Sequence, residues 1–172
     1  VNMDGFIISH SIESMRYIPD EDVKKFVGDY IAVDPLLDID NPKSIGALVL
    51  TDYYMELKRA QHEAMLNVKK VVQDVSAEFA RLTGRKYDLF ETYRLEDADT
   101  AIVALNSAAG TIKDEVDRYR EKGVKVGLLK PRMFRPFPYE EIGAALKNAK
   151  AICVMDRADS YGGYGPLFME IA

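Results

Sequence analysis

Apolar side chains recur every three or four positions over residues 52–83, a long stretch near the middle of the chain. This spacing puts them on one face of an α-helix. Asp52 is a suitable N-cap, and Gly84 is a suitable residue just beyond the end. The apolar face consists of Leu57, Ala60, Ala64, Val68, Val71, Val75, Phe79 and Leu82. At about 1.5 Å per residue the helix would be roughly 45 Å long. We therefore predict that it bridges two domains or lies at a subunit interface.

The second half of the chain alternates short apolar runs with amphipathic segments. Continuous apolar runs of this length are typical of buried parallel strands, and we predict strands over 100–107, 124–129 and 151–156. The segments between them predict helices over 111–122 and 139–149. A strand–helix–strand–helix–strand order implies right-handed crossovers and a parallel sheet. The predicted fold class is therefore α/β.

The first third of the chain predicts less regular structure. Residues 4–10 read as a short strand and its exit, and residues 20–28 predict a helix with acidic residues early and lysines late, as the helix dipole prefers. Prolines and a glycine interrupt residues 31–50, which predict an irregular connector. Residues 86–94 alternate loosely and predict a strand or an extended lead-in to the sheet.

Composition and charge exclude several classes of protein. The chain has 172 residues, which suits one domain or one domain plus part of another. Its net charge of −5 argues against a nucleic-acid-binding surface. No apolar run approaches the roughly 18 residues of a membrane span, and the first residues lack the basic region of a signal peptide. Because the chain begins at Val1 and ends within a predicted helix, we expect it to be part of a longer polypeptide.

Cys153 is the single cysteine of the chain. It allows no internal disulfide and no metal or iron–sulfur site made of this chain's ligands alone. Because it falls in the apolar run AICVM, we expect a buried, unreactive thiol. A reducing, cytoplasmic setting fits this cysteine usage.

Residues 123–138 form a stiff basic segment, GVKVGLLKPRMFRPFP. Its apolar beginning predicts a strand, and Lys130, Arg132 and Arg135 follow, with Phe134 and Phe137 among them. The prolines at 131, 136 and 138 remove backbone donors and fix φ, so we expect neither helix nor inner strand there. The segment indicates a surface held in one shape for a partner or an anionic group.

A second candidate site is the turn over residues 106–111, which joins a predicted strand to a helix. Backbone amides of Asn106 and Ser107 at such a turn can bind a phosphate or carboxylate. The other reading is structural, with Gly110 as the tight-turn residue and Thr111 as the N-cap. The chain contains no GxGxxG or GxxxxGK[ST] motif that would favour a nucleotide.

The glycine-rich loop over residues 156–166 is the third candidate. It follows the last predicted strand, at the sheet edge where ligands of α/β proteins bind. Asp156 and Arg157 could form an ion pair that shapes it, and Gly162 and Gly163 allow unusual backbone conformations. A structural or interface role and direct ligand contact both remain open. His10 and His62 lack partners at metal-ligand spacing, and no residue stands out as catalytic.

Several segments resemble the α subunit of the 2-oxoacid:ferredoxin oxidoreductases, most closely the pyruvate:ferredoxin oxidoreductases. The resemblance extends in order over most of the chain. The matching segments are DGFIISH (4–10), FVGDY (26–30), NPKSIGAL (41–48), LTGRKYDLFETYRLEDAD (82–99), VDRYREKGVKVGLLKPRMFRPFP (116–138) and MDRADSYGGYGPLF (155–168).

The resemblance implies a fold and a function that the residue pattern does not. It implies the end of a pyrimidine-type thiamine-diphosphate-binding domain (1–45), a connector and long helix (46–85), and a transketolase C-terminal-like α/β domain (86–172). The family decarboxylates a 2-oxoacid on thiamine diphosphate with magnesium, passes electrons through iron–sulfur clusters to ferredoxin, and transfers the acyl group to coenzyme A. We expect this chain alone to bind none of these cofactors and to contain no catalytic residue. The family's YPITP-type segment and its cofactor-activating glutamate lie upstream of DGFxxSH, and nothing here matches them.

The resemblance also implies contacts with other subunits or domains. We predict such an interface at Arg132, Phe134, Arg135, Phe137, Asp156, Arg157, Gly162 and Gly163. Anion or coenzyme A contacts are the alternative for Asn106, Ser107, Lys130, Arg132 and Arg135. Many relatives have Gly-Ser where this chain has Asn106-Ser107, which weakens the anion reading at that turn. A non-catalytic α/β module that binds a small anion or a partner protein is the competing hypothesis, and a branched-chain 2-oxoacid is the alternative substrate.

Overall fold

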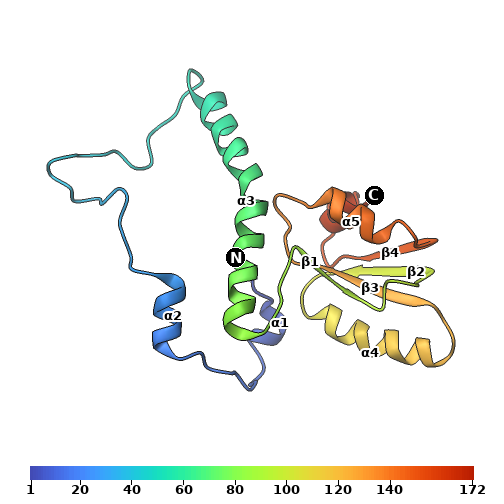
Figure 1. The fold of residues 1–172 in the computed structure, drawn as a ribbon. Coiled ribbons are helices and arrows are strands. Elements are labelled where there is room, and N and C mark those ends of the chain that lie inside the picture. The colour runs from blue at the N-terminus through green and yellow to red at the C-terminus, as the bar shows by residue number, and fades with distance from the viewer.

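We describe a computed structural model that covers residues 1–172. The chain divides into an extended amino-terminal part and a layered α/β part (Figure 1). The first part contains α1 (Gly5–Ile8), α2 (Asp20–Val27) and α3 (Tyr54–Thr83). The second contains β1 (Phe90–Tyr93), β2 (Thr100–Ala104), α4 (Ala108–Glu121), β3 (Val126–Pro131), α5 (Tyr139–Leu146), β4 (Ala151–Met155) and α6 (Pro166–Ile171). The predicted α/β class is confirmed.

The four strands form one sheet in the order β1-β3-β2-β4. Strands β2, β3 and β4 are parallel, as predicted; Val103 of β2 lies opposite Leu129 on one side and Val154 on the other. The lead-in strand β1 instead pairs antiparallel with β3, with Phe90 opposite Pro131. It forms one edge of the sheet and β4 forms the other.

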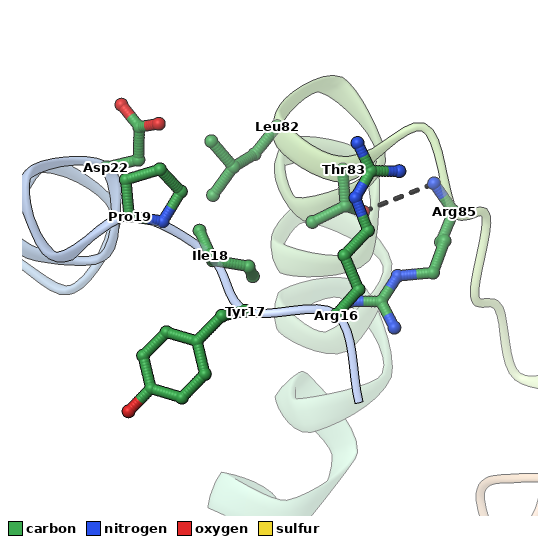
Figure 2. Close-up of a pocket in the computed structure, with 8 residues that line it drawn as sticks. All are labelled: Arg16, Tyr17, Ile18, Pro19, Asp22, Leu82, Thr83 and Arg85. Carbon is green, nitrogen blue, oxygen red and sulfur yellow. Dashed lines mark hydrogen bonds between the residues drawn. The ribbon is translucent and has the colours of Figure 1, made fainter. Parts of the chain in front are cut away.

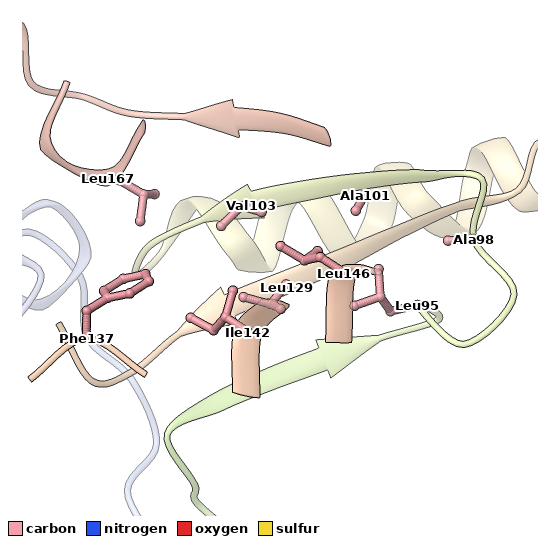
Figure 3. Close-up of a cluster of buried hydrophobic side chains, with 9 residues drawn as sticks. All are labelled: Leu95, Ala98, Ala101, Val103, Leu129, Phe137, Ile142, Leu146 and Leu167. Carbon is pink, nitrogen blue, oxygen red and sulfur yellow. The ribbon is translucent and has the colours of Figure 1, made fainter. Parts of the chain in front are cut away.

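The two faces of the sheet are covered by different helices. Successive residues of a strand point to opposite faces, and adjacent Leu128 and Leu129 of β3 belong to different core clusters. Leu128 packs with Ile112 and Val116 of α4. Leu129 packs on the other face with residues of α5 and α6 (Figure 3). Burial on both faces explains why the central strands read as continuous apolar runs.

Helix α3 is the long helix that the apolar periodicity predicts. It begins after Tyr53, so Asp52 is not its N-cap, and it ends at Gly84 in the left-handed conformation. Its carboxyl-terminal half packs on its neighbours: the ring of Phe79 contacts Phe26 of α2 at 5.9 Å and Tyr87 at 5.8 Å. No residue of α3 is fully buried.

The expected strand over residues 4–10 is wrong. Residues 5–8 form the short helix α1, because Asp4 accepts the Phe6 N–H at 2.9 Å and acts as an N-cap. The Ser11 hydroxyl donates to the Ile7 carbonyl at 2.6 Å and holds the helix end. Local hydrogen bonds of this kind compete well with a strand that has no neighbour to pair with. Residues 28–53 contain no helix or strand, as predicted for 31–50.

Three further details differ from expectation. Helix α4 begins at Ala108, so Gly110 and Thr111 lie inside it rather than at its start. Pro131 ends the inner strand β3, which is tolerated because the ladder with β2 ends at Leu129 and needs no donor from the proline. Cys153 is exposed rather than buried, because β4 lies at the sheet edge and only Val154 among its residues is half-buried.

None of the helices is both long enough and apolar enough to cross a membrane.

Candidate functional site

The carboxyl ends of β2 and β4 lie at the sheet edge where an α/β protein usually binds a ligand. After β2 the chain passes through α4 to β3, which lies on one side of β2 in the sheet. Strand β4 lies on the other side of β2. Helices α4 and α5 therefore cover opposite faces (Figure 1). Such a reversal is a topological switch point. The turn after β2 carries Asn106 and Ser107, and the loop after β4 carries Asp156 and Arg157.

The turn after β2 binds a carboxylate, and that carboxylate belongs to the chain itself. The Ser107 N–H donates to Oδ2 of Asp4 at 2.8 Å, across 103 positions of sequence. Asn106 takes the left-handed conformation (φ 53°), and Ser107 is the N-cap of α4. A hydrogen bond from the Ser107 side chain, the Phe6 and Ser107 amides and the Arg157 charge lower the pKa of Asp4. The amide position predicted to bind an anion is thus occupied by Asp4.

The loop after β4 is organised by Asp156. Its carboxylate accepts the N–H of Leu167 at 2.6 Å, in the first turn of α6, and that of Ala158 at 3.1 Å. The proposed ion pair between Asp156 and Arg157 does not form, because the carboxylate bonds these amides instead. A Cβ on Gly165 would lie 2.5 Å from Oδ2 of Asp156, so the close approach requires glycine.

Arg157 points back toward the amino-terminal segment. Its guanidinium lies 3.5 Å from the centre of the Phe6 ring, a close cation–π contact. Further along the loop, Tyr161 and Gly162 both have positive φ (44° and 88°), and Ser160 pairs with Gly163 across them. This tight turn leaves the Tyr161 side chain fully exposed.

The two arginines of the basic segment are neutralised within the chain. Arg132 pairs with Glu91 of β1, and its guanidinium lies 4.5 Å from the Tyr87 ring centre. Arg135 pairs with Glu170 of α6 at 2.5 Å and donates to the Phe134 carbonyl at 2.7 Å. Anions in solution would have to compete with these carboxylates.

The other members of the basic segment have different environments. Phe137 lies in the core cluster and is 7% exposed, whereas Phe134 is half-buried and packs on it with ring centres 5.9 Å apart. Lys130 is half-buried and forms no ion pair. The segment is therefore held in shape by its own core contacts and by carboxylates from β1 and α6.

A hollow of about 210 Å³ lies between the segment before α2 and the end of α3 (Figure 2). Arg16 and Arg85 lie beside it, and the Arg85 N–H donates to Oγ1 of Thr83 at 3.2 Å. Arg85 also lies 5.3 Å from the Phe79 ring centre. Cations at the end of α3 complement the negative end of the helix dipole, so the arginines have a structural explanation there. No group of three or more His, Cys, Asp or Glu side chains is arranged to hold a metal ion.

Comparisons with known proteins match both parts of the chain. Residues 1–77 match the family "pyruvate flavodoxin/ferredoxin oxidoreductase, thiamine diphosphate-binding", and residues 98–172 match "pyruvate:ferredoxin oxidoreductase core domain II". Pyruvate synthase subunit PorA of Thermotoga maritima is 52% identical over 171 residues, which are 99% of this chain and 44% of that protein. The chain belongs to the pyruvate:ferredoxin oxidoreductase family.

Two further proteins are similar to this chain. Ketoisovalerate oxidoreductase subunit VorA of Pyrococcus horikoshii is 40% identical over 96% of this chain and 42% of its own. A solved 2-oxoglutarate:ferredoxin oxidoreductase from Magnetococcus marinus is 24% identical, with a TM-score of 0.41, over 60% of this chain and 17% of that one. The chain spans somewhat less than half the length of the curated relatives it matches. The resemblance drawn from its motifs is confirmed.

The structure of this oxidoreductase-family chain brings together one set of predicted residues and separates the others. Ser107 and Arg157 both contact residues 4–6 at the switch point. Arg132 and Arg135 instead bind carboxylates on β1 and α6 respectively. Sequence reasoning missed Asp4 and Phe6 as partners of the two loops. Both residues belong to the DGF motif, but a contact across 103 positions, such as that of Asp4 with Ser107, has no local sequence signature.

The ion pair between Glu91 and Arg132 allows the contribution of the basic segment to stability to be tested. Hydrogen bonds from Lys113 and then Arg132 lower the pKa of Glu91. A carboxylate with a lowered pKa stabilises the fold above its ordinary pKa and loses this effect as pH falls through the folded-state pKa. We expect Glu91→Gln to cost about 1–2 kcal/mol at neutral pH, because it leaves two cations without a counter-charge. Urea unfolding from pH 3 to 7 should show a flatter acid limb for this variant.

The matched control for this measurement is Glu115→Gln. Glu115 pairs with Arg118 on the exposed side of α4, where both side chains are more than 40% exposed. Surface pairs of this kind contribute little, so we expect a change within about 0.5 kcal/mol. Equal losses in the two variants would contradict a special role for Glu91.

Proposed function

We propose that this chain is the region of a 2-oxoacid:ferredoxin oxidoreductase α subunit that joins the thiamine-diphosphate-binding domain to core domain II. The observation that carries the proposal is 52% identity to a pyruvate synthase subunit over 171 residues. The order of the two family matches along the chain supports it further. We propose the division 1–45 for the end of the first domain and connector, 46–85 for the connector and long helix, and 86–172 for the transketolase C-terminal-like domain.

The proposed activity belongs to the whole enzyme. It is the oxidative decarboxylation of pyruvate with coenzyme A to acetyl-CoA and CO2, with the electrons passed to ferredoxin. This region would support the active site and contact the other subunits, through the basic segment and the loop over residues 156–166. The internal pairing of Arg132 and Arg135 favours a shaped contact surface over a free coenzyme A site. We propose a cytoplasmic location, in keeping with a single free cysteine.

The residues of this chain do not fit the cofactors that the family implies. An iron–sulfur cluster needs several cysteine ligands, and Cys153 is alone. The magnesium of a bound diphosphate needs converging oxygen ligands, and no carboxylate cluster offers them here. The magnesium and the clusters would therefore be held by other parts of the enzyme. We expect the isolated chain to have no oxidoreductase activity.

The test uses the complete subunit assembled with its partner subunits. Reduction of ferredoxin that depends on both pyruvate and coenzyme A, and that the isolated 172-residue chain does not support, would bear the proposal out. Turnover of a 2-oxoacid by the isolated chain would contradict it. Parallel assays with a branched-chain 2-oxoacid address the substrate, because a ketoisovalerate oxidoreductase subunit is 40% identical over most of the chain. A clear preference for the branched-chain acid would overturn pyruvate while leaving the reaction class intact.

A non-catalytic module that binds a small anion has less support. The amide that would bind the anion already bonds Asp4, and the two best-placed arginines already bond Glu91 and Glu170. Lys130 has no carboxylate partner, and a single half-buried lysine is a weak anion site.

A further inference from the structure

The two loops at the switch point of this chain contact its own amino-terminal segment. In open α/β sheets this position holds the ligand. Here Asp4 approaches from one side to bond Ser107 after β2, and Phe6 lies under Arg157 after β4. The two contacts come from loops that follow adjacent parallel strands, so residues 4–6 are bound at two points of the same sheet edge.

The chemistry of the grip is specific for the residues that it holds. The Asp4 carboxylate accepts the N–H of Phe6 at 2.9 Å and that of Ser107 at 2.8 Å, at the amino end of the 14-residue helix α4. Backbone donors and the helix dipole both favour a carboxylate there. Arg157 adds its positive charge to Asp4 and its guanidinium face to the Phe6 ring. An uncharged residue at position 4 would lose the charge interactions of the carboxylate. An aliphatic residue at position 6 would lose the cation–π contact with Arg157.

Helix α1 cannot hold this position by itself. It has four residues, far fewer than the roughly 12 that an isolated helix needs. Every other hydrogen bond made by residues 4–11 is local to that segment. The side chains of Phe6, Ile7 and Ile8 are largely exposed. The placement of α1 on the sheet therefore depends on the contacts with Ser107 and Arg157.

We propose that Ser107 and Arg157 form a two-point receptor for residues 4–6, which docks the thiamine-diphosphate-binding part of the chain on core domain II. This inference rests on the proposed function for the naming of the two parts. Asp4, Ser107 and Arg157 are then positioning residues. They set where the segment leaving the thiamine-binding domain lies relative to the sheet, and the switch point serves as a contact between domains rather than a small-molecule site.

Amide hydrogen exchange on the full 172-residue chain tests the receptor without any assay of activity. We expect Asp4→Ala to speed exchange of the Ser107 amide and of residues 5–8 by about tenfold, because a charge-assisted hydrogen bond is lost and local opening follows. Arg157→Ala should act on residues 5–8 in the same way. The double variant should add little, because both changes undock the same segment. Exchange in β2 and β3 should not change.

Three controls separate docking from general destabilisation. Asp29→Asn removes a carboxylate of the connector that makes no hydrogen bond or ion pair, and should change nothing. Arg157→Lys retains the charge but not the planar face, and should restore part of the protection. In the parent chain, protection of residues 5–8 should fall at acid pH, since docking lowers the pKa of Asp4 and is lost as pH falls through the docked-state value. Asp4→Asn should abolish this acid dependence.

Unchanged exchange at Ser107 and residues 5–8 in Asp4→Ala would overturn the proposal. Uniformly faster exchange throughout the sheet would also overturn it, because it would show a general stability effect. Neither result bears on ferredoxin reduction by the complete enzyme. A failure of the docking proposal is therefore distinguishable from a failure of the proposed function.

Discussion

Replacing Gly127 with alanine is expected to destabilise the fold by about 3 kcal/mol, at the upper end of the usual cost of overpacking. Gly127 lies in the central strand β3, directly under the loop that leaves β1. An alanine Cβ would lie 2.7 Å from the Leu95 Cα and closer still to the Arg94 carbonyl oxygen. Both are backbone atoms that cannot rotate away, so the loop or the strand would have to move.

The loop over β3 is fastened where the new methyl group would push. Arg120 of α4 donates to the Arg94 carbonyl at 2.6 Å and to the Val126 carbonyl at 2.7 Å. The same guanidinium pairs with Asp97 at 2.8 Å. Shifting residues 94–97 would break these bonds as well as the packing of Leu95, which is 7% exposed.

Gly143→Ala is the matched control for Gly127→Ala. Gly143 lies within α5, and nothing lies within 4 Å of an added Cβ. Alanine should stabilise the helix by about 0.4–1 kcal/mol, because the unfolded chain loses conformational freedom. Denaturant unfolding of both variants checks the pair. A Gly127→Ala variant as stable as the parent would show that the loop is not held against the strand.

Leu129→Ala is expected to cost about 2–5 kcal/mol, the usual range for a fully buried leucine. Leu129 is fully buried in β3, in the cluster that joins the sheet to α5 and α6 (Figure 3). Its neighbours on the adjacent strands are fixed in register, with Val103 on one side and Thr92 on the other. The vacated space therefore cannot close without distorting the sheet.

Leu37→Ala tests the same chemical change without burial. The Leu37 side chain is 92% exposed in the connector. We expect a change within about 0.5 kcal/mol, as at most surface positions. Equal thermal or urea midpoints for Leu129→Ala and the parent chain would contradict the described core.

Local patterns predicted most of the α/β part correctly, since each of its elements carries its own signal. The apolar runs of β2 and β3 reflect burial on two faces, which any doubly covered strand must show. The long apolar stripe of α3 and the glycine at its end are also local features. Pro166 at the first turn of α6 follows the usual preference of proline for that position.

The errors have two causes: local hydrogen bonds that the apolar pattern does not reveal, and contacts with residues distant in sequence. Cys153 sits in an apolar run like those of the inner strands, but the strand order leaves β4 at an edge. Residues 4–10 look extended, but the Asp4 carboxylate caps a helix and bonds Ser107. Asp156 and Arg157 are adjacent in sequence, yet one bonds the amides of Ala158 and Leu167 and the other contacts Phe6.

The amino-acid sequence by itself determined the family, the α/β class and the order of the helices and strands in the α/β part. Each of these depends on residue identity or on periodicity within a single element. Only the tertiary structure decided that the loops at the switch point contact residues 4–6, that Arg132 and Arg135 bind carboxylates of the same chain, and that Gly127 lies under a loop. Such contacts join residues about 30 to more than 100 positions apart, and they exist only once the sheet and its two helical layers have brought those residues together.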